Sequence, residues 1–384
     1  MKKLLCVFIA VSAVFLFAGP IRAAQESSQS GYDEYYKEQL EESGADELSD
    51  SLPEDTKKIL SELGVDGTDW QDISNLSPEN YFQKILSVFS GKAQNPLRVM
   101  VCVIAVILLC ALLNGMKLSF GEKPMGGVIG MVGTLCVCSI IVAPIVSCIS
   151  DAADILKAAA GFLLACVPVM AGIMLAAGQP VTAGSYSVLM VAAGNIVSLL
   201  SANFFAPMMN IFLALSVVSS ISPNINLGGL CSVLNKAVKW IMGLCMTLFT
   251  GLITMHSVIS SSVDSSNSKT AKFIVSSFVP VVGNALGEAF NTINGCVKML
   301  KSGVGAFGLL AGIFIFLPVV AECLLWILTL TLCSGIGEMF GLREITSLLK
   351  ASADVVSTML AILLCCMAVL IVSTVLMLVI GGVS

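Results

Sequence analysis

The chain has 384 residues, of which 57% are hydrophobic and only 12% are charged. Soluble domains carry about 25% charged residues, so the composition excludes an ordinary water-soluble fold and indicates a membrane protein. Residues 25–96 hold 16 acidic side chains against five lysines. Nucleic acid binding needs a basic surface to contact the phosphates, so this acidic segment argues against it.

Residues 1–23 have the pattern of a signal peptide, with Lys2 and Lys3 before the apolar core Leu4–Ala18. The alternative is an anchor that is not cleaved. Together with the change in composition near residue 97, this pattern predicts three regions. They are a signal peptide (1–23), an acidic helical segment outside the cytoplasm (24–96) and a transmembrane domain of several spans (97–384).

The acidic segment is expected to contain short helices at Tyr32–Glu42, at Pro53–Leu63 and from Pro78 onward. The third is the best defined, because Ser77 can cap it and Pro78 occupies the first helical position. A segment of this size with few large apolar side chains cannot be expected to fold tightly alone. We therefore predict that it docks on a partner or on the membrane face.

Hydrophobic runs long enough to cross a bilayer, which takes about 20 residues, fill the chain after residue 97. Backbone N–H groups inside hydrocarbon need partners within their own helix, so the runs predict an all-α, polytopic membrane domain. Turns are expected between them, for example at Ser150–Asp154 and Gly178–Pro180. The predicted spans are Leu97–Met116, Met125–Ile149, Ala158–Ala177, Val238–Ile259, Val304–Cys333 and Val355–Val383.

The stretch Ser185–Ser220 is too long for one comfortable span, and Asn203 and Pro207 interrupt it. One long tilted helix or two short helices would both fit, which gives seven or eight spans in total. The positive-inside rule favours neither count. Amphipathic stretches precede several spans, most clearly at Asn284–Lys301, and are expected to lie in the headgroup layer or to pack as re-entrant helices.

Glu322 is the most informative single residue, because it lies within a predicted span, four residues after Pro318. Placing an acidic side chain at the centre of a membrane helix costs about 2.5–3.5 kcal/mol on insertion scales. We therefore consider two roles for Glu322. It relays protons or cations or lines a pore, or it makes a structural contact between helices or subunits. The other polar candidates are Glu288, Asn203 and Asn210, and the candidate helix-breaking or packing residues are Pro168, Pro280, Pro318, Gly283 and Gly287.

The chain offers little material for catalysis. His256 is the only histidine, and the sequence has no phosphate-binding loop. The 14 cysteines lie almost entirely in apolar runs. We expect them to act there as small residues that pack between helices. We therefore predict a protein without enzymatic activity, cofactor or metal.

Several short motifs are shared with a known family. They are Tyr35–Tyr36, Leu52–Pro53, Leu76–Ser77–Pro78, Val167–Pro168–Val169 and, most specifically, the stretch Phe278–Ala289. With the signal peptide and the hydrophobic array around them, the whole chain resembles the stage III sporulation protein AE family of endospore-forming bacteria. The family has no assigned catalytic residues to carry over.

This resemblance implies a mother-cell membrane protein that works with the other membrane proteins of the stage III sporulation A operon and with a forespore membrane protein. The complex is expected to form a channel or secretion apparatus around the forespore, and to be needed for forespore maintenance and late forespore gene expression. The alternative hypothesis is a self-sufficient permease or ion-coupled transporter that uses Glu322.

Overall fold

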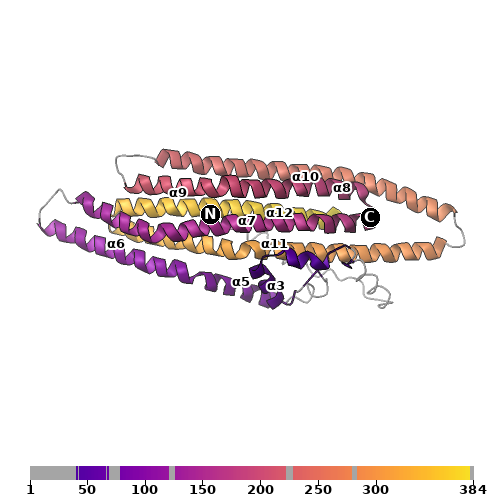
Figure 1. Cartoon of the computed structure of the whole chain (residues 1–384), viewed down its shortest axis with the longest axis horizontal. Coiled ribbons are helices and arrows are strands. Elements are labelled where there is room, and N and C mark those ends of the chain that lie inside the picture. Colours follow the sequence, from indigo (N-terminus) through magenta and orange to yellow (C-terminus); the bar gives the residue numbers. More distant parts are fainter. Residues whose placement is uncertain are drawn as a thin grey trace.

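The computed structural model describes residues 40–41, 43–65, 67–68, 78–120, 126–221, 228–278 and 283–380. Every regular element among these residues is a helix (Figure 1), which confirms the predicted all-α class. The N-terminal elements are the 3-10 helix η1 (Asp46–Ser51), α3 (Glu54–Glu62) and α5 (Pro78–Lys92). The remaining elements are α6 (Gln94–Phe120), α7 (Gly126–Ala176), α8 (Pro180–Leu200), the π-helical turn η2 (Ser201–Phe205), α9 (Ala206–Ile221), α10 (Gly228–Phe278), α11 (Gly283–Met339) and α12 (Arg343–Ile380).

The long helices lie side by side in an elongated bundle (Figure 1). Within it, α11 packs against α12, α7, α6 and α5. The largest fully buried side chains include Trp326, Phe307, Phe314 and Phe316, all of which belong to α11. The hydrophobic core is therefore centred on α11.

Five stretches of the described helices are long and apolar enough to cross a membrane. This agrees with a polytopic membrane protein, although seven or eight spans are expected from the sequence. The numbers differ because two predicted spans share α7 (Gly126–Ala176), and because the predicted span Val238–Ile259, which lies in α10, is not among the five. The five stretches are Gln94–Met116, Ile129–Ala176, Pro180–Ile221, Gly295–Met339 and Arg343–Val375.

Helix α7 joins two of the predicted spans, and the turn predicted at Ser150–Asp154 is wrong. This region is helical throughout. It contains neither glycine nor proline, and its alanines favour helix, so polarity alone did not stop the helix. Pro144 and Pro168 also lie inside α7 without ending it.

The stretch Ser185–Ser220, for which one long helix or two short helices both fitted the sequence, forms one helical run. In this run η2 connects α8 to α9. Pro207 lies just after the π-helical turn and has no N–H to donate to the carbonyl group of Asn203. A π-helical turn is one way in which a helix absorbs such a defect. The run therefore continues through Asn203 and Pro207.

The predicted turn at Gly178–Pro180 is confirmed. Gly178 has a φ of 71°, and the Gln179 N–H donates to the carbonyl group of Met174 at 2.9 Å. This is the pattern of a glycine-terminated helix, and Pro180 then begins α8. Gly341, with a φ of 70°, ends α11 in the same way.

The two N-terminal helices predicted at Pro53–Leu63 and from Pro78 are confirmed as α3 and α5. The stretch Asn284–Lys301, in contrast, is a continuous part of α11 instead of a separate amphipathic helix. The signal peptide (1–23), Ser77, Pro280 and most of the helix predicted at Tyr32–Glu42 lie outside the described residues.

Candidate functional site

Glu322 lies on α11 between the buried residues Ala321 and Cys323, and its side chain is only 16% exposed. Its Oε2 atom lies 3.1 Å from the Nζ atom of Lys92, the last residue of α5. The acid that the sequence places within a span is therefore paired with a lysine from the N-terminal segment. This arrangement is an example of the structural contact considered for Glu322.

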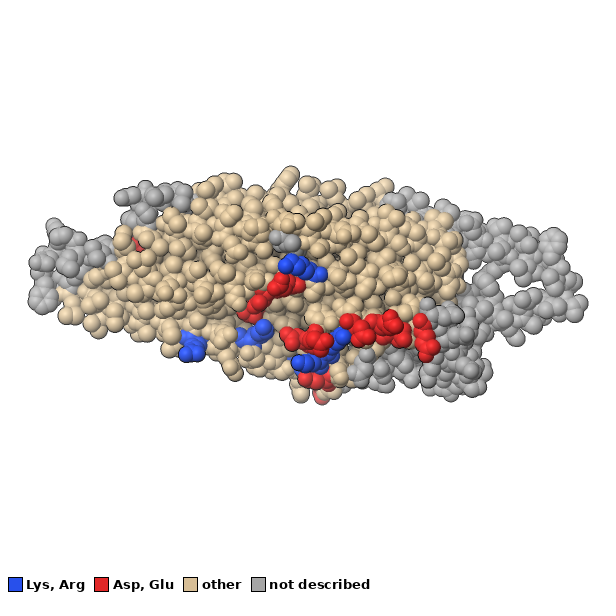
Figure 2. Space-filling model, in the orientation of Figure 1, with Lys and Arg blue, Asp and Glu red and all other residues tan. Residues whose placement is uncertain are grey.

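Further charged residues gather beside this ion pair. Asp151 of α7 interacts electrostatically with Glu322, Lys92 and Asp154. Asp154 in turn accepts a bond of 3.1 Å from Lys157, one helical turn further along α7. We call these five residues the charged cluster. Figure 2 shows acidic and basic side chains concentrated near the middle of one side of the bundle, among a surface that carries few other charges.

The ion pair offsets part of the free-energy cost of removing the Glu322 carboxylate from water. An isolated carboxylate inside a low-dielectric bundle loses its hydration, and a nearby ammonium group recovers part of that energy. Lys92 is 42% exposed, so it keeps contact with solvent while its amino group reaches inward. The pair thus fastens the end of α5 to the middle of α11.

The rest of the N-terminal segment packs on the same side of the bundle. Leu48, Leu60 and Val65 are almost completely buried, and η1 and α3 contact α7 and α11 respectively. The ring of Tyr81 on α5 meets that of Phe314 on α11 edge to face, with centroids 5.5 Å apart. The segment predicted to dock on a partner or the membrane therefore docks on helices of its own chain.

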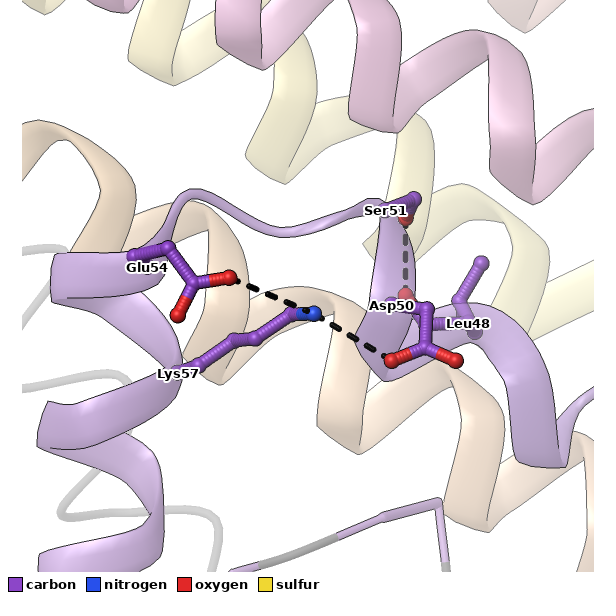
Figure 3. Close-up of polar contacts among 5 residues, drawn as sticks. All are labelled: Leu48, Asp50, Ser51, Glu54 and Lys57. Carbon is purple, nitrogen blue, oxygen red and sulfur yellow. Dashed lines mark hydrogen bonds and ion pairs between the residues drawn. The ribbon is translucent and has the colours of Figure 1, made fainter.

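Polar contacts hold the segment together. Lys57 lies between the carboxylates of Asp50 and Glu54, at 3.2 and 3.9 Å (Figure 3). Lys84 of α5 pairs with Glu62 of α3, and the buried Thr68 hydroxyl donates to the carbonyl group of Ala45 at 3.1 Å. These contacts join η1, α3 and α5 into one unit that ends at Lys92.

The other candidate residues do not gather around Glu322. Asn203 lies in the π-helical turn and Asn210 in α9, and both are exposed. Glu288 lies in the first turns of α11, where side chains are not described. The structure therefore does not bring the polar candidates together at one site within the part of the chain that it describes.

The candidate prolines and glycines have separate positions. Pro168 is exposed on α7, Pro318 is partly buried one turn before Glu322, and α11 continues across it. Gly283 is the first residue of α11, and Gly287 follows one turn later. None of these residues ends a helix in the part of the chain that the structure describes. We propose that they act as packing residues.

A groove of about 360 Å³ lies between α6 and α7. Its lining is almost entirely apolar and includes Leu109, Leu113 and Val132. The helices approach closely beside it, because a Cβ atom on Gly133 would lie only 2.5 Å from the Sγ atom of Cys110. An open apolar groove on α6 suits a lipid chain better than a polar substrate.

Nothing in the sequence pattern indicates that Lys92 and Asp151 lie beside Glu322. The three residues belong to three different helices, and only packing brings them together. Among the described residues, no group of three or more histidine, cysteine or acidic side chains could hold a metal ion. The contacts that the structure shows within the charged cluster are ion pairs.

Comparison with known proteins gives a consistent result. The family model described as stage III sporulation protein AE matches residues 68–382. A curated relative, stage III sporulation protein AE from Bacillus subtilis (strain 168), is 22% identical over 314 residues, which cover 78% of this chain and 79% of the relative. No solved structure matches the chain. The matched range includes both Lys92 and Glu322.

Proposed function

Because the chain belongs to the stage III sporulation protein AE family, we propose that it is a non-enzymatic membrane subunit of a sporulation channel or secretion complex. In this proposal it lies in the mother-cell membrane around the forespore, with residues 24–96 outside the cytoplasm. Its partners are the other membrane proteins of the stage III sporulation A operon and a forespore membrane protein. The complex supports forespore maintenance and late forespore gene expression.

The observation that carries the proposal is the distance over which apolar side chains are exposed on α7, on both sides of the charged cluster. Met131 and Leu175 are both exposed on α7, and at 1.5 Å per residue they lie about 66 Å apart. The hydrocarbon core of a bilayer is about 30 Å thick, and the usual helix tilts cannot make up the difference. One bilayer therefore does not cover the whole apolar surface, and other subunits are the natural cover for the remainder.

Helix α8 offers a surface for such subunits. Val188, Ile196 and Leu199 on it are exposed by 71%, 53% and 60%. A large exposed apolar surface of this kind marks a contact with lipid or protein. We assign the outer face of α8 to neighbouring subunits and the outer face of α6 to lipid.

The contact between Glu322 and Lys92 supports a structural subunit over a self-sufficient transporter. A proton or cation relay needs an acid that can exchange its ion along a path through the membrane. Here the acid is occupied by a lysine that also anchors a neighbouring segment. The pair therefore fits assembly better than transport.

Co-purification from sporulating cells tests the proposal. Tagged full-length protein should bring down the other membrane proteins of its operon, and Val188→Gln should reduce their recovery several-fold. Leu112→Gln is the matched control, because Leu112 on α6 is exposed to a similar extent, 66%. This change should leave recovery unchanged. A chain that purifies alone, and supports spore formation in cells lacking those partners, would refute the proposal.

A further inference from the structure

Two buried thiols face each other across the bundle beside the charged cluster. The Sγ atoms of Cys148 on α7 and Cys323 on α11 lie 3.6 Å apart. The exposed fractions of the two residues are 1% and 0%. Two sulfur atoms from separate helices are therefore in direct contact inside the core.

This pairing is different from ordinary packing by cysteine. A small polarizable residue fills a gap by itself, and packing does not require a second sulfur opposite it. Cys365 and Cys366, in contrast, are consecutive on α12, so their side chains point about 100° apart around the helix. A disulfide has a sulfur–sulfur distance of about 2.05 Å, so the two sulfur atoms, 3.6 Å apart, must approach each other by about 1.5 Å to form one.

The proposed topology puts the pair near the oxidising side of the membrane. Cys323 follows Glu322, which contacts the N-terminal segment through Lys92, and Cys148 lies one turn before Asp151. The placement of the N-terminal segment outside the cytoplasm is part of the proposed function, and the inference rests on it. Disulfides form and persist in such compartments and are rare in the cytosol.

We propose that Cys148 and Cys323 form a disulfide that fastens α7 to α11 directly beneath the charged cluster. A thiolate of the pair attacks the disulfide of an exported thiol–disulfide oxidoreductase and forms a mixed disulfide. The second thiolate of the pair then displaces the oxidoreductase. The two cysteines lose two electrons and two protons, and the oxidoreductase leaves as a dithiol.

The bond forms while α7 and α11 come together, before the thiols are buried. Once the bundle is packed, the same burial shields the disulfide from reducing agents. The cross-link joins residues 175 positions apart, so it restricts the unfolded chain strongly. It also fixes the separation of Asp151 and Glu322, whose helices then hold the N-terminal segment at a constant site.

Thiol counting on the full-length protein tests this. Protein is purified from membranes in detergent, unfolded in dodecyl sulfate and alkylated with or without prior reduction. The wild-type chain should gain two alkylated cysteines on reduction, and peptide mapping should link the peptides around residues 148 and 323. Cys148→Ser and Cys323→Ser should each abolish the gain, whereas the control Cys366→Ser should keep it.

An equal number of alkylated thiols before and after reduction would overturn the proposal. Treatment of growing cells with diamide, a membrane-permeant thiol oxidant, then separates the two possible causes, because the bond can form while the bundle assembles. If the oxidant creates the link, the geometry holds and the assumed location outside the cytoplasm is wrong. If it does not, the contact between the two thiols is wrong, while the co-purification test of the proposed function is unaffected.

Discussion

Glu322 illustrates how a single acidic side chain is accommodated in an apolar helix. Exposed ion pairs contribute about 0–1 kcal/mol, whereas breaking a buried pair costs about 3–5 kcal/mol. The pair of Glu322, which is 16% exposed, and Lys92, which is 42% exposed, lies between these limits. Its energy is therefore sufficient to influence how firmly the N-terminal segment is held.

A double-mutant cycle on Glu322→Gln and Lys92→Gln measures this energy. We expect each single change to destabilise the protein, and the double variant to lose about 1 kcal/mol less than the sum of the two. Thermal unfolding in detergent gives these values. Strictly additive effects would show that the two side chains do not interact.

Lys157 and Asp154 provide the matched control for this cycle. Their ion pair has a similar length, 3.1 Å, but both side chains are about half exposed or more. It should contribute only about 0.3–0.5 kcal/mol. A coupling as large as that of Glu322 and Lys92 would mean that burial does not strengthen the latter pair.

The contact between α11 and α12 depends on small residues at their crossing. A Cβ atom on Gly308 would lie 3.2 Å from the Cγ2 atom of Thr374, and one on Gly312 would collide with the side chain of Leu370. Thr374 and Leu370 are both buried. These glycines therefore allow the two helices to approach closely.

Replacing Gly312 with Val should push α11 away from α12. Overpacking of this kind costs about 1–3 kcal/mol, so the unfolding midpoint in detergent should fall. Gly161→Ala is the control, because Gly161 lies in α7 with nothing near its missing Cβ atom. It should gain about 0.5–1 kcal/mol from the better helix former, and a loss there would contradict this account of helix packing.

The whole molecule is one long bundle to which the N-terminal segment is fastened near the middle. Helix α6 starts two residues after Lys92. Its C-terminal part meets α7 and α12, because Cys110 of α6 and Ile345 of α12 both lie near Gly133 of α7. Because Gln94–Met116 is a candidate span, we predict that the charged cluster and the turn between α11 and α12 lie on opposite sides of the membrane. This arrangement makes a prediction about accessibility.

Single cysteines introduced at Glu47 and Asp154 in a cysteine-free chain should react with an impermeant maleimide in intact protoplasts. Both residues are exposed, one on the N-terminal segment and one in the charged cluster. Arg343→Cys, at the turn between α11 and α12, should react only after permeabilisation. Labelling of Glu47→Cys without Asp154→Cys would contradict the docking of the segment on the bundle.

Local chemistry determined the class of the protein and several helix boundaries. Long apolar runs must be helices in lipid, so the all-α membrane class follows from the pattern of hydrophobic residues alone. Pro78 and Gly178 act through their own backbone geometry, which is why the start of α5 and the end of α7 were predictable.

Packing determines the contacts between distant residues, which cannot be predicted from any short segment of the sequence. The partner of Glu322 is Lys92, and the neighbour of Cys323 is Cys148, far away along the chain. The missing turn at Ser150–Asp154 has a local cause instead, because polar residues interrupt the apolar run there without interrupting the helix. Contacts between distant residues depend on which helix faces meet, and that is fixed only when the whole bundle is assembled.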